Sequence, residues 1–428
     1  MASHQGLLIL MALALMAGAA GGMEQEMTKT STAQRLTLAA EPVHEIGQLA
    51  REPMVVAHPD GTLFLAGFGS KVTGVDPNKP PLLWKSTDGG LQWTPVAVGN
   101  AEDGARGNSD VDLAIGPDGA LYFVTMGFDR STFEGTHITV GVSHDAGENW
   151  DWTVLSETRG DDRPWVAVAP DGTAHVVWND GKGVNHASST DGGQRWTRTD
   201  KRVFDVGGSS HLAVGPEGML AVRITPISAS GRQFDEGVDK VAVSTDKGRS
   251  WVLHDAPGQL VWDPTFQQPG VIPRWVEPVA WDAQGALYSL WSEGTNVRLA
   301  RSTDRGASWA IHEVADDQMA AFFPYLVAQP SGELAATWFT GNRQEDSLFV
   351  NVAHFSATAS ADAAPRIVRA EPFVPETWQD RVDVKARDTA GEYVPVLFLP
   401  DGTLGVATPV QDAHNDRYGF TWWRFEVE

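Results

Sequence analysis

Short stretches in which hydrophobic and polar residues alternate recur along the chain, and the same kind of turn joins them in pairs. The first turn reads His-Pro-Asp-Gly-Thr-Leu over residues 58–63, and Gly-Pro-Asp-Gly-Ala-Leu follows at 116–121. In such a turn Pro fixes φ, Asp bonds the local backbone and Gly takes the left-handed position, which predicts β-hairpins. The turns recur every 46 to 70 residues, a spacing typical of repeat architectures. Their glycines are Gly61, Gly119, Gly172, Gly218, Gly285, Gly332 and Gly402.

A second repeated element lies between successive hairpin turns and has the pattern Ser-x-Asp-x-Gly-x-x-Trp. The Ser and Asp side chains can satisfy backbone N–H groups of a tight turn, and Trp can bury its ring between layers. This turn chemistry accounts for the five aspartates, so we assign them neither metal binding nor catalysis. The five copies are Ser86–Trp93, Ser143–Trp150, Ser189–Trp196, Ser244–Trp251 and Ser302–Trp309.

This pattern resembles the Asp-box (BNR repeat) of sialidases and related β-propellers, and the resemblance covers nearly all of the chain after its N-terminus. We therefore predict an all-β protein, a β-propeller of four-stranded blades. Each unit would contain strand A, the Pro-Asp-Gly turn, strand B, a loop, strand C, the Asp-box and strand D. Seven units favour seven blades; six is the alternative, because most sialidases have six. The last unit shows only three strands, and the alternating segment 35–38 could supply the fourth and close the ring.

Composition and charge argue against some classes of partner and of chain. With 32 Lys+Arg against 55 Asp+Glu, the net charge is −23, which argues against nucleic acid as a partner. There is no cysteine, and 42% hydrophobic with 20% charged residues indicates a globular chain. We expect a monomer.

The N-terminus has the pattern of an export signal. Residues 7–20 form an apolar run ending in small residues, shorter than the roughly 20 residues that span a bilayer. We predict a signal peptide over 1–20, a tail over 21–31 and a single propeller over 32–428. The protein would then be secreted or periplasmic, with no membrane span.

In a propeller, the residues just before each strand A meet at one mouth of the central channel. Here they combine arginine, carboxylate, tyrosine and aromatic side chains, a lining that suits a sugar bearing a carboxylate, which Arg can bind in bidentate fashion. The alternative is that these groups only solvate a wet channel. They are Arg51, Glu52, Ser109, Asp110, Asp162, Arg163, Ser209, Ser210, Trp275, Glu277, Phe322, Phe323, Glu392 and Tyr393.

The resemblance to sialidases implies roles for four residues. Arg51, followed by Glu52-Pro53, is similar to the first member of the arginine triad that holds the sialic acid carboxylate. Tyr393 corresponds to the nucleophile and Glu277 to the carboxylate that polarises it. Asp76 is the candidate acid/base. A tyrosine nucleophile suits an anomeric carbon that bears a carboxylate.

The chain also departs from the sialidase pattern. The second triad arginine is absent at its expected place, and Arg298 is the nearest candidate. Phe322 and Phe323 stand where the third is expected, so Arg163 or Arg274 would have to take its place in space. A site with a single arginine would hold a carboxylate less well, by about 2 to 5 kcal/mol.

Two functions of different class follow. The first is a secreted sialidase-like glycoside hydrolase that acts on terminal sialic acid or a related acidic sugar. The second is a non-catalytic propeller that binds a glycan or a protein partner in the cell envelope. We expect no cofactor and no metal; Asp103, Asp110 and Asp112 could hold calcium, but solvated loop carboxylates explain them equally well.

Overall fold

The structure is a computed structural model, and all its described residues belong to one compact unit, Gln34–Glu428. The described residues are 35–47, 50–69, 76–225, 238–260, 276–342, 347–358, 360, 363–374, 392–412 and 417–427.

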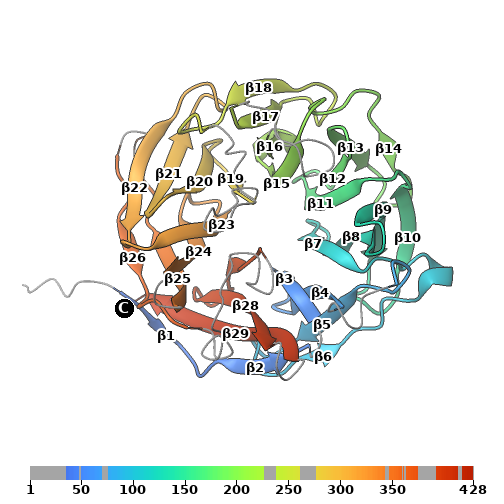
Figure 1. Cartoon of the computed structure of the whole chain (residues 1–428), viewed down its shortest axis with the longest axis horizontal. Helices are drawn as coiled ribbons and strands as arrows, with labels where there is room; N and C mark the ends of the chain where they lie inside the picture. The colour runs from blue at the N-terminus through green and yellow to red at the C-terminus, as the bar shows by residue number, and fades with distance from the viewer. Residues whose placement is uncertain are drawn as a thin grey trace, which may run out of the picture. The chain divides into compact units, whose positions relative to one another are not determined.

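Seven antiparallel sheets follow one another along the chain and form a seven-bladed β-propeller (Figure 1). The prediction of seven blades is confirmed, and the six-bladed alternative is wrong. In each of the first six blades the strands pair in sequence order, with the first strand nearest the centre. The described residues contain no α-helix, only two 3-10 turns, and thus none that could cross a membrane.

The first three blades have these strands. Blade 1 contains β3 (Ala50–Ala57), β4 (Leu63–Gly69), β5 (Leu82–Ser86) and β6 (Thr94–Pro95). Blade 2 contains β7 (Ser109–Ile115), β8 (Leu121–Asp129), β9 (Glu134–Ser143) and β10 (Asp151–Ser156). Blade 3 contains β11 (Asp161–Val168), β12 (Ala174–Asp180), β13 (Val184–Ser189) and β14 (Thr197–Arg198).

The next three blades repeat this order. Blade 4 contains β15 (Gly208–Val214), β16 (Leu220–Thr225), β17 (Lys240–Ser244) and β18 (Val252–Asp255). Blade 5 contains β19 (Val279–Trp281), β20 (Leu287–Glu293), β21 (Asn296–Ser302) and β22 (Ala310–Asp316). Blade 6 contains β23 (Ala320–Ala328), β24 (Leu334–Asn342), β25 (Ser347–Phe355) and β26 (Ile367–Arg369).

Blade 7 is built from both ends of the described chain. Its inner strands are β27 (Val396–Phe398), β28 (Leu404–Asp412) and β29 (Arg417–Val427). On the far side of β29 lie β1 (Leu36–Leu38), with Leu36 opposite Val427, and β2 (Val43–Ile46). The N-terminal segment thus covers a sheet edge that would otherwise be open.

The Ser-x-Asp-x-Gly-x-x-Trp turns have the hydrogen bonds that their pattern predicts. In the first, the Ser86 hydroxyl accepts from Gly90 N (2.9 Å) and donates to Asp88 (2.8 Å), which in turn accepts from Gln92 N (2.9 Å). The Trp93 indole N–H donates to the Gly90 carbonyl (2.9 Å). The next three turns repeat all of these contacts, and the fifth repeats those of the Ser and Asp side chains, whereas the Trp309 indole N–H has no hydrogen-bond partner within the described residues. These aspartates therefore hold the turn itself together.

The glycine of this turn also packs against the preceding blade. At Gly90 an added Cβ would lie 2.0 Å from the Trp422 ring, and at Gly248 it would lie 2.2 Å from the His186 ring. Both glycines have positive φ (93° and 83°), so both backbone conformation and space require glycine. The turn thus joins one blade closely to its neighbour.

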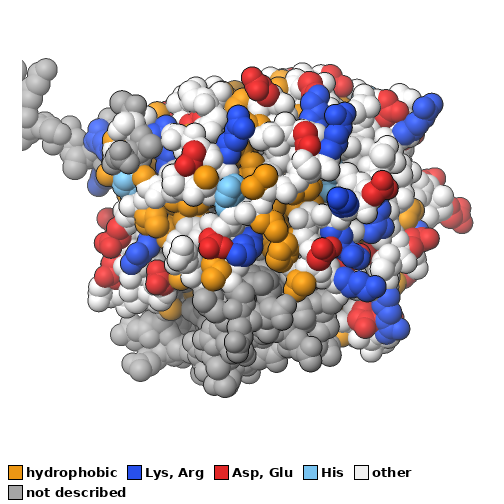
Figure 2. Space-filling view, turned by 90° about the horizontal axis from the view of Figure 1, so that it is seen from above, with side chains coloured by type: hydrophobic (Ala, Val, Ile, Leu, Met, Phe, Trp, Pro, Cys, Tyr) orange, Lys and Arg blue, Asp and Glu red, His pale blue; other side chains and the backbone are white. Residues whose placement is uncertain are grey.

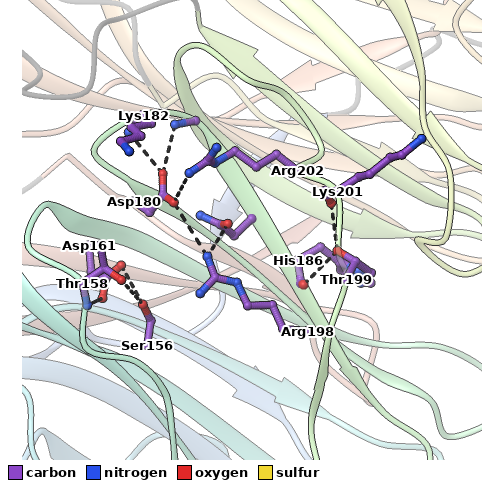
Figure 3. A network of polar contacts seen from close by, with 12 residues as sticks. Ser156, Thr158, Asp161, Asp180, Lys182, His186, Arg198, Thr199, Lys201 and Arg202 are labelled. Atoms are coloured by element: carbon purple, nitrogen blue, oxygen red, sulfur yellow. Dashed lines mark hydrogen bonds and ion pairs between the residues drawn. The ribbon is translucent and has the colours of Figure 1, made fainter.

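Outer strands carry polar networks of their own. In blade 3, Arg198 lies over the Trp178 ring (5.1 Å) and donates to Asn185 (2.6 Å). Arg198 and Arg202 both approach the Asp180 carboxylate, at 3.7 and 2.6 Å (Figure 3). On the side of the molecule seen in Figure 2, acidic and basic side chains are interspersed, so the net charge is not gathered into one acidic patch on this face.

Candidate functional site at the channel mouth

The innermost strand of five blades carries a β-bulge close to its first residue. The register shifts between Arg51 and Met54 in β3 and between Asp162 and Trp165 in β11. Similar shifts occur in β7, β15 and β23. A bulge adds an unpaired residue and re-aims its side chain. These are the positions where the sequence predicts side chains converging on the channel.

Three of the bulges hold a non-glycine residue in the left-handed region. The φ angles are +53° at Glu52, +47° at Arg163 and +49° at Phe323, and each residue precedes a proline. This conformation costs about 1–2 kcal/mol per residue for an L-amino acid. Strained backbone of this kind gathers at functional sites, where the surrounding fold imposes it.

An ion pair joins two blades that are not neighbours in the ring. Arg163 Nη2 of blade 3 lies 3.2 Å from Glu392 Oε2, four residues before the first strand of blade 7. The Trp165 and Tyr393 rings meet edge to face at 5.5 Å between the same blades. Since blades 1 and 2 separate blades 7 and 3 on one side, these contacts cross the channel.

Two further arginines lie in this cluster. Burial lowers the pKa of Arg130, and the positive charge of Arg51 lowers it further, while Glu52 opposes the shift. Arg51 has a buried Nε without a hydrogen-bond partner, and it makes no ion pair within the described ranges. Two guanidinium groups with the same charge repel each other, and an anion bound between them would offset that repulsion.

Two carboxyl groups near the arginines, those of Glu52 and Asp162, have raised pKa values. Burial, and then the charge of Asp110, raises the pKa of Glu52 well above its ordinary value. Burial raises the pKa of Asp162 to about 7, against the opposing charge of Arg163. Asp162 nevertheless keeps 45% of its side chain exposed, which fits a residue that lines a hollow. The guanidinium charges are therefore only partly balanced at pH 7.

Tyr393 lies among these charges. Its side chain is buried, and burial followed by the charge of Asp110 raises the pKa of the phenol well above 10. Arg163 opposes this shift, whereas Glu392 and Glu52 add to it. The phenol is neutral at pH 7, and a base must take its proton before or as it attacks an electrophile.

Among the predicted site residues, the structure brings together Arg51, Arg163 and Tyr393. Glu277 lies instead in a buried ionic group between blades 4 and 5. Arg223 Nη2 contacts Glu277 at 2.8 Å and Asp239 at 2.9 Å, and all three side chains are almost fully buried.

The other predicted residues have local contacts. Asp76 is exposed and accepts from Asn78 N at 2.9 Å. Arg298, on β21, lies 3.7 Å from Glu293 and is 39% exposed. None of these contacts joins either residue to the mouth cluster. Arg274 lies outside the described residues.

The three aspartates considered for calcium take separate roles. Asp103 closes a capping box with Asn100, Asp110 acts on the mouth cluster, and Asp112 accepts from Val166 N at 2.9 Å. Within the described residues no group of three or more potential metal ligands occurs.

The sequence reasoning did not find Arg130, which follows β8 on the loop between the second and third strands of blade 2. That loop opens on the same face as the starts of the innermost strands, because adjacent strands run antiparallel. This topological rule could have singled out Arg130, whereas residue spacing within strand A could not.

A second polar layer lies deeper in the channel. His211 packs between Trp165 (5.2 Å) and Tyr325 (5.7 Å), and burial lowers its pKa to about 4. Burial raises the pKa of Asp112 to about 7, and the charge of Asp112 in turn helps to raise that of Tyr325. His211 and Tyr325 are therefore neutral at pH 7, whereas Asp112 is about half protonated there.

At the turn end of the innermost strands, away from the mouth cluster, lies an open hollow of about 690 Å³. Its lining exposes polar and apolar surface in nearly equal amounts and includes His58, Ile115, Val168, Gln329, Phe398 and four prolines of the hairpin turns. The mouth is the end that combines charge, strain and shifted pKa values, and such combinations cluster at functional sites.

Comparison with known proteins supports the fold. A protein of unknown function from Dyadobacter fermentans is 15% identical over 92% of this chain and 98% of its own, with a TM-score of 0.51. An α-L-arabinofuranosidase from Fusarium graminearum is 13% identical over 88% of this chain and 92% of its own (TM-score 0.45). A Hadza microbial sialidase is 14% identical over 76% of this chain and 66% of its own (TM-score 0.46). No protein-family model and no curated protein matches the chain. The likeness is one of fold.

Proposed function

We propose that the channel mouth binds the carboxylate of a terminal acidic sugar, of the sialic acid class, and that the protein hydrolyses its glycosidic bond. The observation that carries this proposal is that Arg163 interacts with Tyr393, while Arg51 and Arg130 interact with each other and with Glu52, which also acts on Tyr393. Arg51 and Arg130 raise each other's energy, and an anionic ligand would relieve that repulsion. The sequence alone offered only Arg51 at a matching position.

In this proposal Tyr393 is the nucleophile. Its oxygen forms a bond to the anomeric carbon while its proton passes to Asp110, the carboxylate with the largest effect on its pKa. The leaving oxygen takes a proton from Asp162, whose pKa of about 7 suits a general acid. Water then attacks the anomeric carbon and gives a proton to Asp162, while the sugar–tyrosine bond breaks and the Tyr393 oxygen recovers its proton from Asp110. A neutral phenol avoids the repulsion that the sugar carboxylate would exert on an anionic nucleophile.

The sequence assigned the base to Glu277 and the acid to Asp76. The ion pair of Glu277 with Arg223 favours a structural role for Glu277, and Asp110 takes its place in the mechanism proposed here. Export through the predicted signal peptide is part of this proposal, since sugars of this class end glycan chains outside the cell.

A second candidate function is binding without hydrolysis. The observation that favours it is that Arg163 already contacts a carboxylate of the protein, Glu392, beside the candidate nucleophile. The protein would then hold an acidic glycan at the same mouth and release it unchanged.

Fluorophore release from a methylumbelliferyl sialoside tests the proposal. We expect turnover by the wild type, loss of turnover in Tyr393→Phe, and no change in Tyr122→Phe, a buried tyrosine away from the mouth. If the folded wild type binds the sialoside without turnover, the second candidate holds. If it neither binds nor hydrolyses it, both are refuted.

A further inference from the structure

The Arg163–Glu392 ion pair lies in the path of a ligand. The two residues come from blades on opposite sides of the channel, and their side chains keep 12% and 23% of their surface exposed. An ion pair that spans the mouth places a carboxylate of the protein against an arginine, which is the contact that an acidic ligand needs. The ligand carboxylate and Glu392 therefore have the same partner.

We propose that Glu392 is an internal competitor that occupies the carboxylate position of Arg163 until an acidic ligand displaces it. This inference rests on the proposed function. The alternative role for such a carboxylate is to hold the arginine in place for the ligand, and the two roles predict effects of opposite sign.

The contact geometry favours competition. Carboxylates that fix an arginine use the bidentate fork, with N–O distances of about 2.7–2.9 Å. Here Arg163 Nη2 contacts Glu392 Oε2 at 3.2 Å, which is longer than that range. The backbone at Arg163 is also fixed by features that do not involve Glu392: the bulge of β11, its left-handed φ and the proline that follows it.

The charges around the site also favour competition. Asp162 lies 3.9 Å from Arg163, so Arg163 keeps a carboxyl neighbour on its own strand if Glu392 moves away. Glu392 raises the pKa of Glu52, Asp162 and Tyr393, so it acts on the whole mouth as a negative charge. Its removal would make the mouth more attractive to an anion.

Calorimetric titration with N-acetylneuraminic acid and with neutral N-acetylmannosamine tests the proposal. We expect Glu392→Gln to bind the acid about tenfold more tightly than the wild type, equivalent to about 1.4 kcal/mol, with no gain for the neutral sugar. Glu148→Gln is the matched control, because it removes the same charge from an exposed site on the outer rim. It should leave both affinities unchanged.

The remaining outcomes separate this inference from the proposed function. Weaker or unchanged binding of the acid by Glu392→Gln would overturn the competitor role, as would equal gains for both sugars. Arg51→Ala reports on the proposed function: if it abolishes acid binding while Glu392→Gln has no effect, the function stands and the inference fails. If no variant binds the acid, both fail.

Discussion

Replacement of Asp112 by Asn tests whether the channel stores unfavourable electrostatic energy. Asp112 belongs to β7, below the mouth, and its carboxylate accepts from Val166 N at 2.9 Å and from Leu113 N at 2.9 Å. Burial nevertheless raises its pKa from 3.8 to about 7. The folded protein thus keeps a proton that the unfolded chain releases near pH 4, so the ionised carboxylate opposes folding increasingly as the pH rises from about 4 to 7.

The size of the effect follows from the shift. One pKa unit corresponds to about 1.4 kcal/mol, so the full shift sets an upper limit of about 4 kcal/mol above pH 7. Asp112 keeps some exposed surface, which reduces this value. We expect the free energy of unfolding of Asp112→Asn, relative to wild type, to increase by about 1–3 kcal/mol between pH 5 and pH 8. Comparing two pH values cancels the constant effect of any altered hydrogen bond.

Urea unfolding followed by tryptophan fluorescence at both pH values measures this difference. Asp88→Asn is the control, because the Gln92 backbone N–H lowers the pKa of this exposed carboxyl. Both its folded and unfolded forms are ionised above pH 5, so its difference from wild type should stay constant between the two pH values. A constant or decreasing difference for Asp112→Asn would refute the electrostatic reasoning.

Three further predictions concern the packing and strain of the blades. Burial lowers the pKa of His186 to about 3, so the folded protein resists protonation of this ring and the free energy of unfolding falls as the pH drops below 6.5. In urea unfolding we expect the free energy of unfolding of His186→Asn to fall by about 3 kcal/mol less than that of wild type by pH 4. Gly248→Ala should lower the melting temperature far more than Gly172→Ala. Both glycines have positive φ, but only at Gly248 would an added Cβ overlap a side chain, the His186 ring. Equal decreases in melting temperature would show that the contact between the blades is unimportant. Glu52→Gly should stabilise the protein more than Glu217→Gly at pH 8. Both relieve a left-handed φ, by about 1 kcal/mol, but only Glu52 is a half-buried carboxyl with a raised pKa, whereas Glu217 is exposed. The contrary order in denaturant unfolding would show that burial of Glu52 carries no cost.

Repetition made the fold predictable. The hairpin turns and the Ser-x-Asp-x-Gly-x-x-Trp turns use local chemistry, in which a side chain bonds backbone a few residues away, so they can be recognised from sequence. Their count gave seven blades, and the alternation at 35–38 indicated the strand that pairs with β29. Each of these inferences depends on contacts near in sequence or on a repeated unit.

The candidate site was predictable only in part, because its geometry depends on contacts distant in sequence. The starts of the innermost strands were correctly placed together, and Arg51, Arg163 and Tyr393 lie there. The direction of each side chain, however, depends on bulges that spacing does not reveal. Glu277 shows this: from the start of its blade it contacts Arg223 of the neighbouring blade. The pairing of Arg163 with Glu392 spans 229 residues and likewise has no local signal.

A crystal structure of the protein with bound N-acetylneuraminic acid would test the central claim most directly. We predict the sugar at the channel mouth, with its carboxylate on Arg51 and Arg163 and its anomeric carbon facing Tyr393, and with Glu392 displaced from Arg163. A sugar bound instead in the hollow at the turn end, or one whose carboxylate contacts none of the mouth arginines, would contradict the account.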